Sequence, residues 1–573
     1  MTESQKAEML KTLAELPKGY VSRKVIRGRE TFYHQWKEAG KVKSRYLKAA
    51  EVESFREQIR RRHAIQEMLV SAGVDVDKKV RCEADPDFET DVKTGESLRQ
   101  FAAGVAGWEK RDALASILKY LRGETIDRVM IVYGLRRTGK TTMLKQAILD
   151  LSPEEFAKAA YIKVSPTSEM AELGRDMDKL HRVGVKFVFI DEVTLMRDFV
   201  SGSALLSDIY AGMQMKVVLS GTDSLGFWLS LKDELYDRAY MVHTTFIPFR
   251  EHGRLLKTDD VDEYIRYGGT LRMGELNLDD PAAFAADASF RDEETTRRYV
   301  DTAIASNIQH SLRFADDGRY FGKLHELYEA GELTNAINRI IEDMNHRFLV
   351  EVVTDNMRSL DIVNRDRQTV GVTNEHVAQI MAYLKALDLL TICPIVSADP
   401  SVPSEDRIIF TQPGMRFAQA QALVHSLNKD RIFATQTDRE RERICAKIES
   451  DVMGRMLEDI VLCETIRAIP YKRDKYKQLR VFKLKFDRGE FDMAIHDPER
   501  ETCRLFEIKH TTERDDSQLR HLLDPDKLAY AERNYGKVLS RTVLYRGKPL
   551  ARKKCVAYCN VAAFLKGIEN EIQ

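Results

Sequence analysis

A glycine-rich stretch early in the chain has the spacing of a phosphate-binding loop, G-x-x-x-x-G-K-[ST]. The apolar run before it predicts a buried strand at 129–133, and the residues after it predict a helix at 141–149. Two glycines allow the backbone to turn so that successive N–H groups and the helix N-terminus face a polyphosphate. The predicted nucleotide-binding residues of this loop are Gly134, Leu135, Arg136, Arg137, Thr138, Gly139, Lys140, Thr141 and Thr142.

Two residues of this loop have distinct expected tasks. Lys140 has the position from which a lysine reaches the β- and γ-phosphates of ATP, and Thr141 has the position of a hydroxyl ligand to Mg²⁺. A glycine-rich turn without function is the alternative. The strand before the loop and the helix after it favour the functional interpretation, so we expect ATP and Mg²⁺ as cofactors.

Acidic residues end a second apolar strand about fifty residues after the loop. Asp191 follows the run at 186–190 and is expected to hold Mg²⁺, while Glu192 is expected to act as the catalytic base that polarises water. Ser220 and Thr222 end the next strand, where a polar side chain can sense the γ-phosphate. Arg238 is a candidate for stabilising transition-state charge, in the same chain or from a neighbouring subunit, with an exposed structural arginine as the alternative.

Five stretches of this region together resemble a known family, namely 133–142, 189–192, 219–222, 237–239 and 247–251. They look like the prokaryotic "archaeal ATPase" family of AAA+/STAND-related P-loop proteins. The resemblance covers residues 105–255. It implies an additional-strand ATPase with Glu192 as base, and members of the family often carry a winged helix and a C-terminal nuclease-like domain.

A second set of acids lies near the C-terminus. Glu458 belongs to a predicted helix, Asp492 to a strand-like stretch, and Glu507 and Lys509 to a further strand, where residues two apart point to the same face. Asp492, Glu507 and Glu458 could share a divalent metal while Lys509 activates or positions water. The order of these residues resembles the PD-(D/E)xK nuclease fold, with Phe491 before Asp492 as a departure from the usual proline. A surface cluster of charges without catalysis is the alternative.

The N-terminal region is basic. Ten Lys or Arg stand against two Glu between Lys18 and Lys48, and five aromatic residues are interleaved with them. Three short strands at 21–26, 31–36 and 41–46 and a helix at 51–69 are predicted. Basic strands that carry aromatics are suited to a phosphate backbone and stackable bases, so nucleic acid, in particular DNA, is the expected partner. A solvated sheet whose aromatics pack on the helix is the alternative.

The composition sets broader limits. The chain has 573 residues with no net charge, and its seven scattered cysteines fit a reducing compartment. The first residues have no apolar signal core and no run reaches membrane-spanning length, so we expect a cytoplasmic protein without membrane partners. A homo-oligomer is possible.

Together these patterns predict an α/β multidomain protein, with a P-loop three-layer core and a C-terminal PD-(D/E)xK-like α/β domain. The expected parts are a basic strand-rich module at 1–69, a linker at 70–105, the ATPase domain at 106–255, a helical region at 256–350, a winged-helix-like domain at 351–430 and the nuclease-like domain at 440–573. The predicted function is ATP-dependent action on nucleic acid with metal-dependent cleavage. The alternative is an NTP-driven switch or scaffold that binds DNA and does not cut it.

Overall fold

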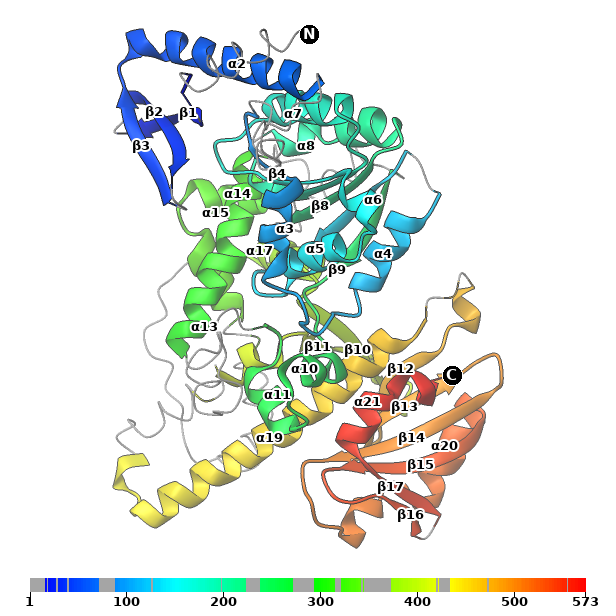
Figure 1. Cartoon of the computed structure of the whole chain (residues 1–573). Helices are drawn as coiled ribbons and strands as arrows, with labels where there is room; N and C mark the ends of the chain where they lie inside the picture. The colour runs from blue at the N-terminus through cyan, green and yellow to red at the C-terminus, as the bar shows by residue number, and fades with distance from the viewer. Residues whose placement is uncertain are drawn as a thin grey trace. The chain divides into compact units, whose positions relative to one another are not determined.

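The computed structural model divides into two units. The first contains residues 1–89 and 94–99, and the second contains residues 90–93 and 100–573. The structure describes residues 16–17, 19–26, 29–38, 41–71, 88–124, 127–196, 198–222, 238–271, 293–314, 321–341, 344, 373–418, 421, 433–470, 472, 474–553 and 555–572. The order of helices and strands can be followed in Figure 1.

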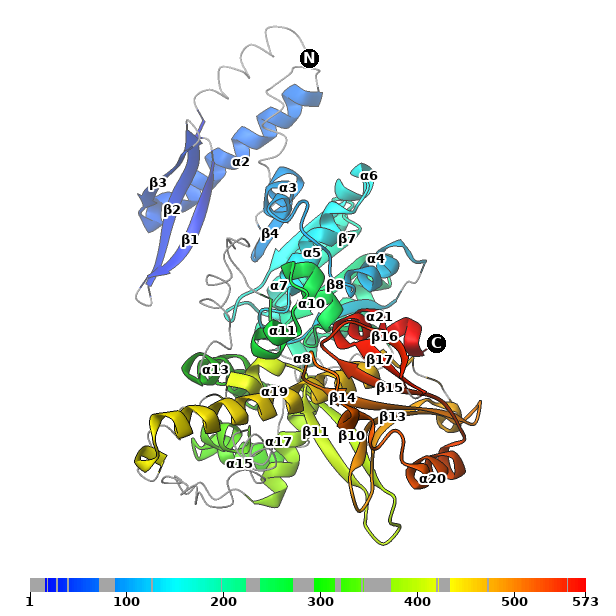
Figure 2. The same cartoon turned by 90° about the horizontal axis from the view of Figure 1, so that it is seen from below.

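The first unit is a three-stranded antiparallel sheet with one long helix (Figure 2). Its elements are β1 (Tyr20–Ile26), β2 (Arg29–Glu38), β3 (Lys41–Leu47) and α2 (Ala49–Ser71). The three predicted strands and the predicted helix are thereby confirmed. The helix covers one face of the sheet, because Phe55 lies 5.0 Å from the ring of His34 and Arg56 lies over the ring of Phe32.

A six-stranded sheet forms the core of the ATPase region, in the order β4-β6-β7-β8-β5-β9. Its strands are β4 (Asp91–Thr94), β5 (Val129–Tyr133), β6 (Ala159–Lys163), β7 (Phe187–Asp191), β8 (Lys216–Gly221) and β9 (Ala239–His243). Strands β5 to β9 run parallel, and β5, β7 and β8 lie where the sequence predicts strands. Strand β8 lies between β5 and β7.

Helices on both sides bury this sheet. They include α4 (Leu114–Arg122), α5 (Lys140–Leu149), α6 (Pro153–Phe156), α7 (Met170–Arg182), α8 (Phe199–Gly202) and a π-helix (Leu206–Ala211). The expected linker at 70–105 needs correction. Residues 72–87 lie outside the described residues, but β4 and α3 (Gly95–Ala103) are regular elements, and Phe101 packs 4.2 Å from the ring of Tyr161. The residues before Thr90 are acidic and show no periodicity, so the sequence did not indicate the short edge strand β4 that follows them.

Helices follow the sheet in the described residues. They are α10 (Phe249–Leu256), α11 (Val261–Tyr267), α13 (Glu293–Tyr299), a π-helix (Val300–Ala305), α14 (Ser306–Phe314), α15 (Gly322–Glu329) and, further on, α17 (Asn374–Ala386). Thr373 caps α17, since its hydroxyl accepts the N–H of His376. Helices α13 to α17 share a buried core that also includes Leu135 from the phosphate-binding loop.

The C-terminal sheet has eight strands in the order β11-β10-β12-β13-β14-β15-β17-β16. These are β10 (Leu390–Ser397), β11 (Glu405–Phe410), β12 (Arg480–Lys485), β13 (Glu490–Asp497), β14 (Thr502–Lys509), β15 (Lys537–Tyr545), β16 (Leu550–Lys553) and β17 (Val556–Asn560). The hairpin β10–β11 lies in the range expected to be winged-helix-like. Because β10 also pairs in parallel with β12, this hairpin continues the C-terminal sheet. A separate winged helix at 351–430 therefore stays a prediction, and residues 351–372 lie outside the described residues.

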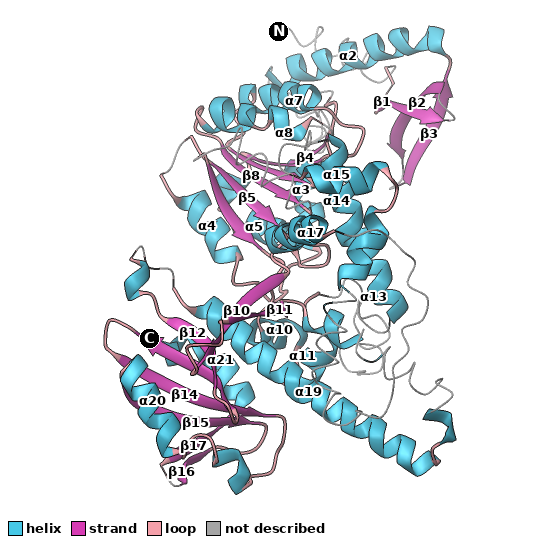
Figure 3. Ribbon diagram, turned by 180° about the vertical axis from the view of Figure 1, so that it is seen from behind, coloured by secondary structure: helices cyan, strands magenta, loops and turns pink. Residues whose placement is uncertain are grey.

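Helices cover the C-terminal sheet on its two faces (Figure 3). They are α19 (Asp438–Ala468), α20 (Pro525–Tyr535) and α21 (Val561–Ile572). Residues of α20 share one buried core with the sheet, and residues of α19 and α21 share another, to which Phe249 and Tyr264 also belong. Among the helices that the structure describes, none combines the length and the apolar character needed to cross a bilayer.

A buried carboxyl group joins α19 to the start of α10. Glu464 of α19 accepts the backbone N–H of Phe249 at 2.6 Å and is almost fully buried. Burial raises the pKa of Glu464 to about 8, although the Phe249 N–H opposes this shift. The carboxyl group is therefore largely protonated at neutral pH inside the folded protein.

Replacing Glu464 with glutamine should flatten the dependence of stability on pH. A carboxyl group with a folded-state pKa near 8 and an ordinary value of 4.5 contributes stability that is complete below 4.5. That contribution is lost as pH rises toward and through 8, because the unfolded chain releases the proton first. Urea midpoints of wild type and Glu464→Gln between pH 5 and 9 test this, and parallel pH profiles for the two proteins would contradict it.

Candidate ATPase site and candidate metal site

The phosphate-binding loop lies between β5 and α5, as predicted. Gly134 and Gly139 adopt φ of 151° and 84°, and a Cβ on Gly134 would lie 2.5 Å from the Thr244 hydroxyl, so both positions require glycine. The ammonium group of Lys140 is buried and donates to the carbonyls of Gly134 and Leu135 at 2.8 and 2.9 Å. Burial lowers the pKa of Lys140, while Glu192 and Asp191 oppose this shift. Thr142 follows in the first turn of α5.

The two predicted acids lie beside this loop at the end of β7. Asp191 Oδ2 accepts the hydroxyls of Thr141 and Tyr161 at 2.7 and 2.9 Å, and Oδ1 accepts that of Ser220 at 2.5 Å. The structure thus brings Thr141 and Asp191 together, and their oxygen atoms are the donors that Mg²⁺ prefers. A bound Mg²⁺ would neutralise charge on the phosphates there.

Glu192 differs from Asp191 in its backbone. It adopts φ of 59°, in the left-handed region that a non-glycine residue rarely occupies. Its carboxylate accepts the hydroxyl of Thr222 at 2.9 Å, so the side chains predicted as base and γ-phosphate sensor are in direct contact. Strain of this kind concentrates at functional sites, where surrounding structure holds a side chain in a required direction.

Sequence reasoning missed the arginine that anchors the loop. Arg111 is buried and all five of its N–H groups find acceptors. It donates to both carboxylate oxygens of Glu251 at 2.9 and 3.0 Å, and to the carbonyls of Thr138, Thr244 and Phe246 at 2.7 to 3.0 Å. No local pattern distinguishes Arg111 among 90 Lys and Arg residues, because its partners lie as far as 140 positions away.

The structure does not bring Arg238 to the phosphate-binding loop, and its role in stabilising transition-state charge within one chain stays a prediction. Arg238 immediately precedes β9, whose first residue pairs with Val129 at the start of β5. The phosphate-binding loop follows Tyr133 at the other end of that strand, and the guanidinium group of Arg238 pairs with Asp208 at 2.7 Å. A role across a subunit interface stays a prediction.

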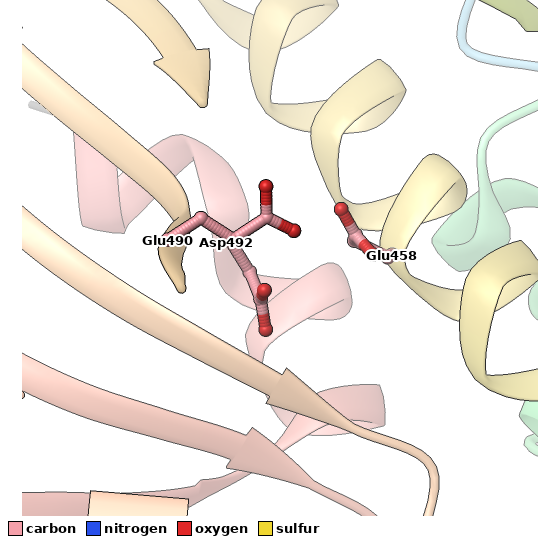
Figure 4. A group of neighbouring side chains, drawn as sticks. All are labelled: Glu458, Glu490 and Asp492. Carbon is pink, nitrogen blue, oxygen red and sulfur yellow. The ribbon is translucent and has the colours of Figure 1, made fainter. Parts of the chain in front are cut away.

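The acids of the C-terminal region also converge. Carboxylate oxygens of Glu458, Glu490 and Asp492 lie within 4.8 Å of one another (Figure 4). Glu458 comes from α19, and the other two come from the start of β13. Glu490 was not predicted, although its E-x-D spacing with Asp492 on a strand already placed both acids on one face.

A β-bulge shapes this end of β13. Phe482 pairs with Ala494 and Leu484 pairs with Phe491, so that Asp492 and Met493 both lie opposite Lys483. Bulges often re-aim side chains beside active sites. The carboxylate of Asp492 accepts the Ile508 N–H at 2.7 Å, and the Lys509 ammonium at 3.1 Å, from β14.

Glu507 and Lys509 complete the predicted E-x-K pair. Their charged groups lie 2.8 Å apart, and Glu507 Oε2 is buried without a hydrogen-bond partner in the described part of the chain. Burial and the neighbouring Asp492 raise the pKa of Glu507 to about 7. Burial also raises the pKa of Asp492, whereas Asp492 and Glu507 raise that of Lys509 against the effect of burial. An unpaired buried carboxylate oxygen is a fitting donor for a divalent cation.

Glu458 has a different environment. Burial alone would raise its pKa, but Lys483, Arg407 and Arg455 hold that pKa well below its usual range. Arg407 Nη1 and Arg455 Nη1 lie 3.2 and 3.3 Å from its carboxylate, and Lys483 forms a further ion pair with it. Glu458 is therefore compensated by protein cations, while Asp492 and Glu507 share the single ammonium group of Lys509.

The geometry of the loop, with Lys140, Thr141, Asp191 and Glu192 around one position, is that of a P-loop ATPase. A family model described as "AAA domain" matches residues 127–252, and one described as "Domain of unknown function (DUF6788)" matches residues 1–57. The central region is accordingly an ATPase domain of the AAA type. Among curated protein sequences, none matches this chain.

Several solved structures are similar to the chain. Aeropyrum pernix ORC1 in complex with DNA is 16% identical, with 60% of this chain and 96% of ORC1 covered and a TM-score of 0.22. AMPPCP-bound DnaA from Aquifex aeolicus is 12% identical, with 62% and 96% covered and a TM-score of 0.19. C. elegans PCH-2 is 15% identical, with 51% and 67% covered and a TM-score of 0.19.

Two substitutions should separate nucleotide binding from turnover. Lys140→Ala should weaken ATP binding about a hundredfold, because it removes a charge-assisted hydrogen-bond donor to phosphate. Glu192→Gln should preserve binding and lower turnover by about a hundredfold or more, because the amide cannot accept a proton. Equilibrium binding of a fluorescent ATP analogue and release of phosphate measure the two effects.

Exposed residues of the same domain supply the controls. Lys119→Ala on α4 and Glu154→Gln on α6 make the same chemical changes at the surface and should leave both quantities unchanged. Hydrolysis by Glu192→Gln at the wild-type rate would show that another group is the base.

Proposed function

We propose that the protein is an ATPase that acts on DNA and cuts it with a metal-dependent site in the C-terminal domain. The observation that carries this proposal is the convergence of Asp492, Glu507 and Lys509 around a buried, unpartnered carboxylate oxygen. Residues placed in this way are suited to holding Mg²⁺, which would stabilise charge developing on a phosphodiester. Nucleic acid as the partner is further supported by the basic N-terminal module.

The residues of this site would have separate tasks. Asp492 and Glu507 would hold the metal, with Glu490 and Glu458 nearby. The ammonium group of Lys509, fixed between two carboxylates, would orient a water molecule or neutralise the phosphate. The raised pKa of Lys509 keeps this group protonated at neutral pH, which favours a charge-neutralising task over that of a base.

A switch or scaffold that binds DNA without cutting it is the second candidate. The observation that favours it is the complete pairing of Glu458 with Lys483, Arg407 and Arg455. A carboxylate held by three cations is a weak ligand for a further cation, because binding would have to displace one of them. The two candidates differ in one measurable property, namely cleavage that depends on a divalent metal.

Asp492→Ala and Lys509→Ala should each abolish DNA cleavage and leave ATP hydrolysis unchanged. The first removes a metal ligand and should also weaken Mn²⁺ binding measured by calorimetry, whereas the second should preserve metal binding. Plasmid cleavage with and without Mg²⁺, and with and without ATP, is the assay. Exposed Asp526→Ala and Lys537→Ala serve as matched controls. Wild-type protein that never cuts, under any of these conditions, would leave the switch as the better proposal.

We further propose that the nucleotide controls the C-terminal site through the segment that follows β11. The carbonyls of Arg136 and Arg137 in the phosphate-binding loop accept the hydroxyl of Tyr299 at 3.2 Å and the N–H of Leu271 at 2.6 Å. A change in the conformation of this loop upon nucleotide binding would therefore act on both Tyr299 and Leu271.

The next contacts join residues 268–271 to the C-terminal domain. Gln412 donates to the carbonyl of Gly269 at 3.1 Å, and Gly414 donates to that of Gly268 at the same distance. A Cβ on Gly269 would lie 2.5 Å from that of Gln412, so this close approach requires glycine. Arg416, two residues further, pairs with Asp459 beside Glu458 at 2.6 Å. These contacts form a contiguous path from the phosphate-binding loop to Asp459.

Gln412→Met should make DNA cleavage independent of ATP. It keeps side-chain volume and removes the amide that bonds Gly269, so ATP hydrolysis should stay within about twofold of wild type. The ratio of cleavage with ATP to cleavage without it should fall toward one. Exposed Gln436→Met is the control, and a wild-type ratio in a folded Gln412→Met protein would contradict this route.

A further inference from the structure

The antiparallel register of the first unit places three tyrosines on one face of its sheet. Tyr33 of β2 pairs with Tyr46 of β3, and Tyr20 of β1 pairs with Gln35, two residues from Tyr33. Side chains two apart on a strand point to the same face. The residues of β2 that contact α2, Phe32 and His34, alternate with them and point to the opposite face.

This face, defined by Tyr20, Tyr33 and Tyr46, exposes aromatic surface. Tyr20 and Tyr46 are 59% and 55% exposed, so much of each side chain is open to solvent. The rings of Tyr33 and Tyr46 meet edge to face at 5.7 Å, and the Tyr20 hydroxyl donates to Gln35 at 2.7 Å. These contacts hold the rings in place, so little conformational entropy would be lost on binding a flat partner.

Charge determines which flat partner fits. Between Lys18 and Lys48 the sequence has ten cationic residues against two glutamates. An excess of this kind attracts a phosphate backbone, whereas exposed aromatic rings are suited to the faces of unpaired bases. In a duplex the base faces are stacked on one another inside the helix. Its phosphates can therefore contact the cations, but its bases cannot stack on the tyrosines.

We propose that the tyrosine face binds single-stranded DNA, with bases stacked on Tyr20 and Tyr46. This inference rests on the proposed action on DNA and specifies the form of DNA that the N-terminal module accepts. Stacking does not depend on base identity, so binding should tolerate any sequence. The cations of the module would track the backbone and give the binding its salt dependence.

Fluorescence anisotropy with full-length protein tests this proposal. The probes are a labelled 20-nucleotide oligo-dT, a labelled 20-base-pair duplex and a labelled 20-nucleotide oligo-U, each at two salt concentrations. The variants are Tyr20→Ala, Tyr46→Ala and Tyr46→Phe. Tyr476→Ala is the matched control, because Tyr476 is 90% exposed in the second unit.

The expected result is tighter binding of oligo-dT than of the duplex, with about tenfold weaker binding for Tyr20→Ala and for Tyr46→Ala. Tyr46→Phe keeps the ring and should bind as wild type, as should Tyr476→Ala. The slope of log affinity against log salt should be the same in wild type and in Tyr46→Ala, because no cation is removed. Thermal unfolding of each variant verifies that it folds.

Other outcomes overturn the inference in distinguishable ways. Equal binding of oligo-dT by folded Tyr46→Ala and wild type would exclude stacking, while a steep salt slope would retain DNA binding by charge. Tighter binding of oligo-U or of the duplex than of oligo-dT would exclude single-stranded DNA as the occupant. Absence of binding to every probe would overturn the proposed action on nucleic acid as well.

Discussion

The buried ion pair between Arg111 and Glu251 joins the phosphate-binding loop to α10, the helix that packs against the C-terminal domain. The guanidinium group of Arg111 donates to the Thr138 carbonyl inside the phosphate-binding loop and to carbonyls in the segment between β9 and α10. Isolated charges in such a place would be costly, and this one is tolerable because every N–H finds an acceptor. The pair therefore fixes the start of α10 relative to the loop.

Helix α10 is in turn bonded to the C-terminal domain. The N–H of Phe249 at the start of this helix donates to Glu464, which lies on α19 six residues after Glu458. Phe249 and Tyr264 belong to the same buried core as α19 and the C-terminal sheet. The loop and the acidic cluster are therefore joined by packed elements, through Arg111 to α10 and from α10 to α19.

The parts of the fold and of the sites that the sequence predicts are those whose determining residues lie close together along the chain. The P-loop, its flanking strand and helix, and the acids at 191 and 192 lie in short stretches whose period and spacing are diagnostic, and the structure has them where expected. The E-x-K pair and Asp492 also converge as predicted, because strand alternation fixes the faces. Arg111, Lys483 and Arg407 carry no such pattern, since their partners are brought together only by the fold. The pairing of the hairpin β10–β11 with β12 also has no local pattern, because α19 lies between these strands in the sequence.

The acidic cluster shows why charge alone cannot decide between a nuclease and a switch. Five carboxylates lie near five cations in this region, namely Glu458, Asp459, Glu490, Asp492 and Glu507 near Arg407, Arg416, Arg455, Lys483 and Lys509. The pairing is uneven, however. Lys483, Arg407 and Arg455 form ion pairs with Glu458, whereas Asp492 and Glu507 form ion pairs with Lys509. A bulge opposite Lys483 brings Asp492 into that position. Burial raises the pKa of both Asp492 and Glu507. A purely structural network would gain by pairing every buried carboxylate oxygen, so the unpartnered Oε2 of Glu507 is the feature that a divalent cation would relieve.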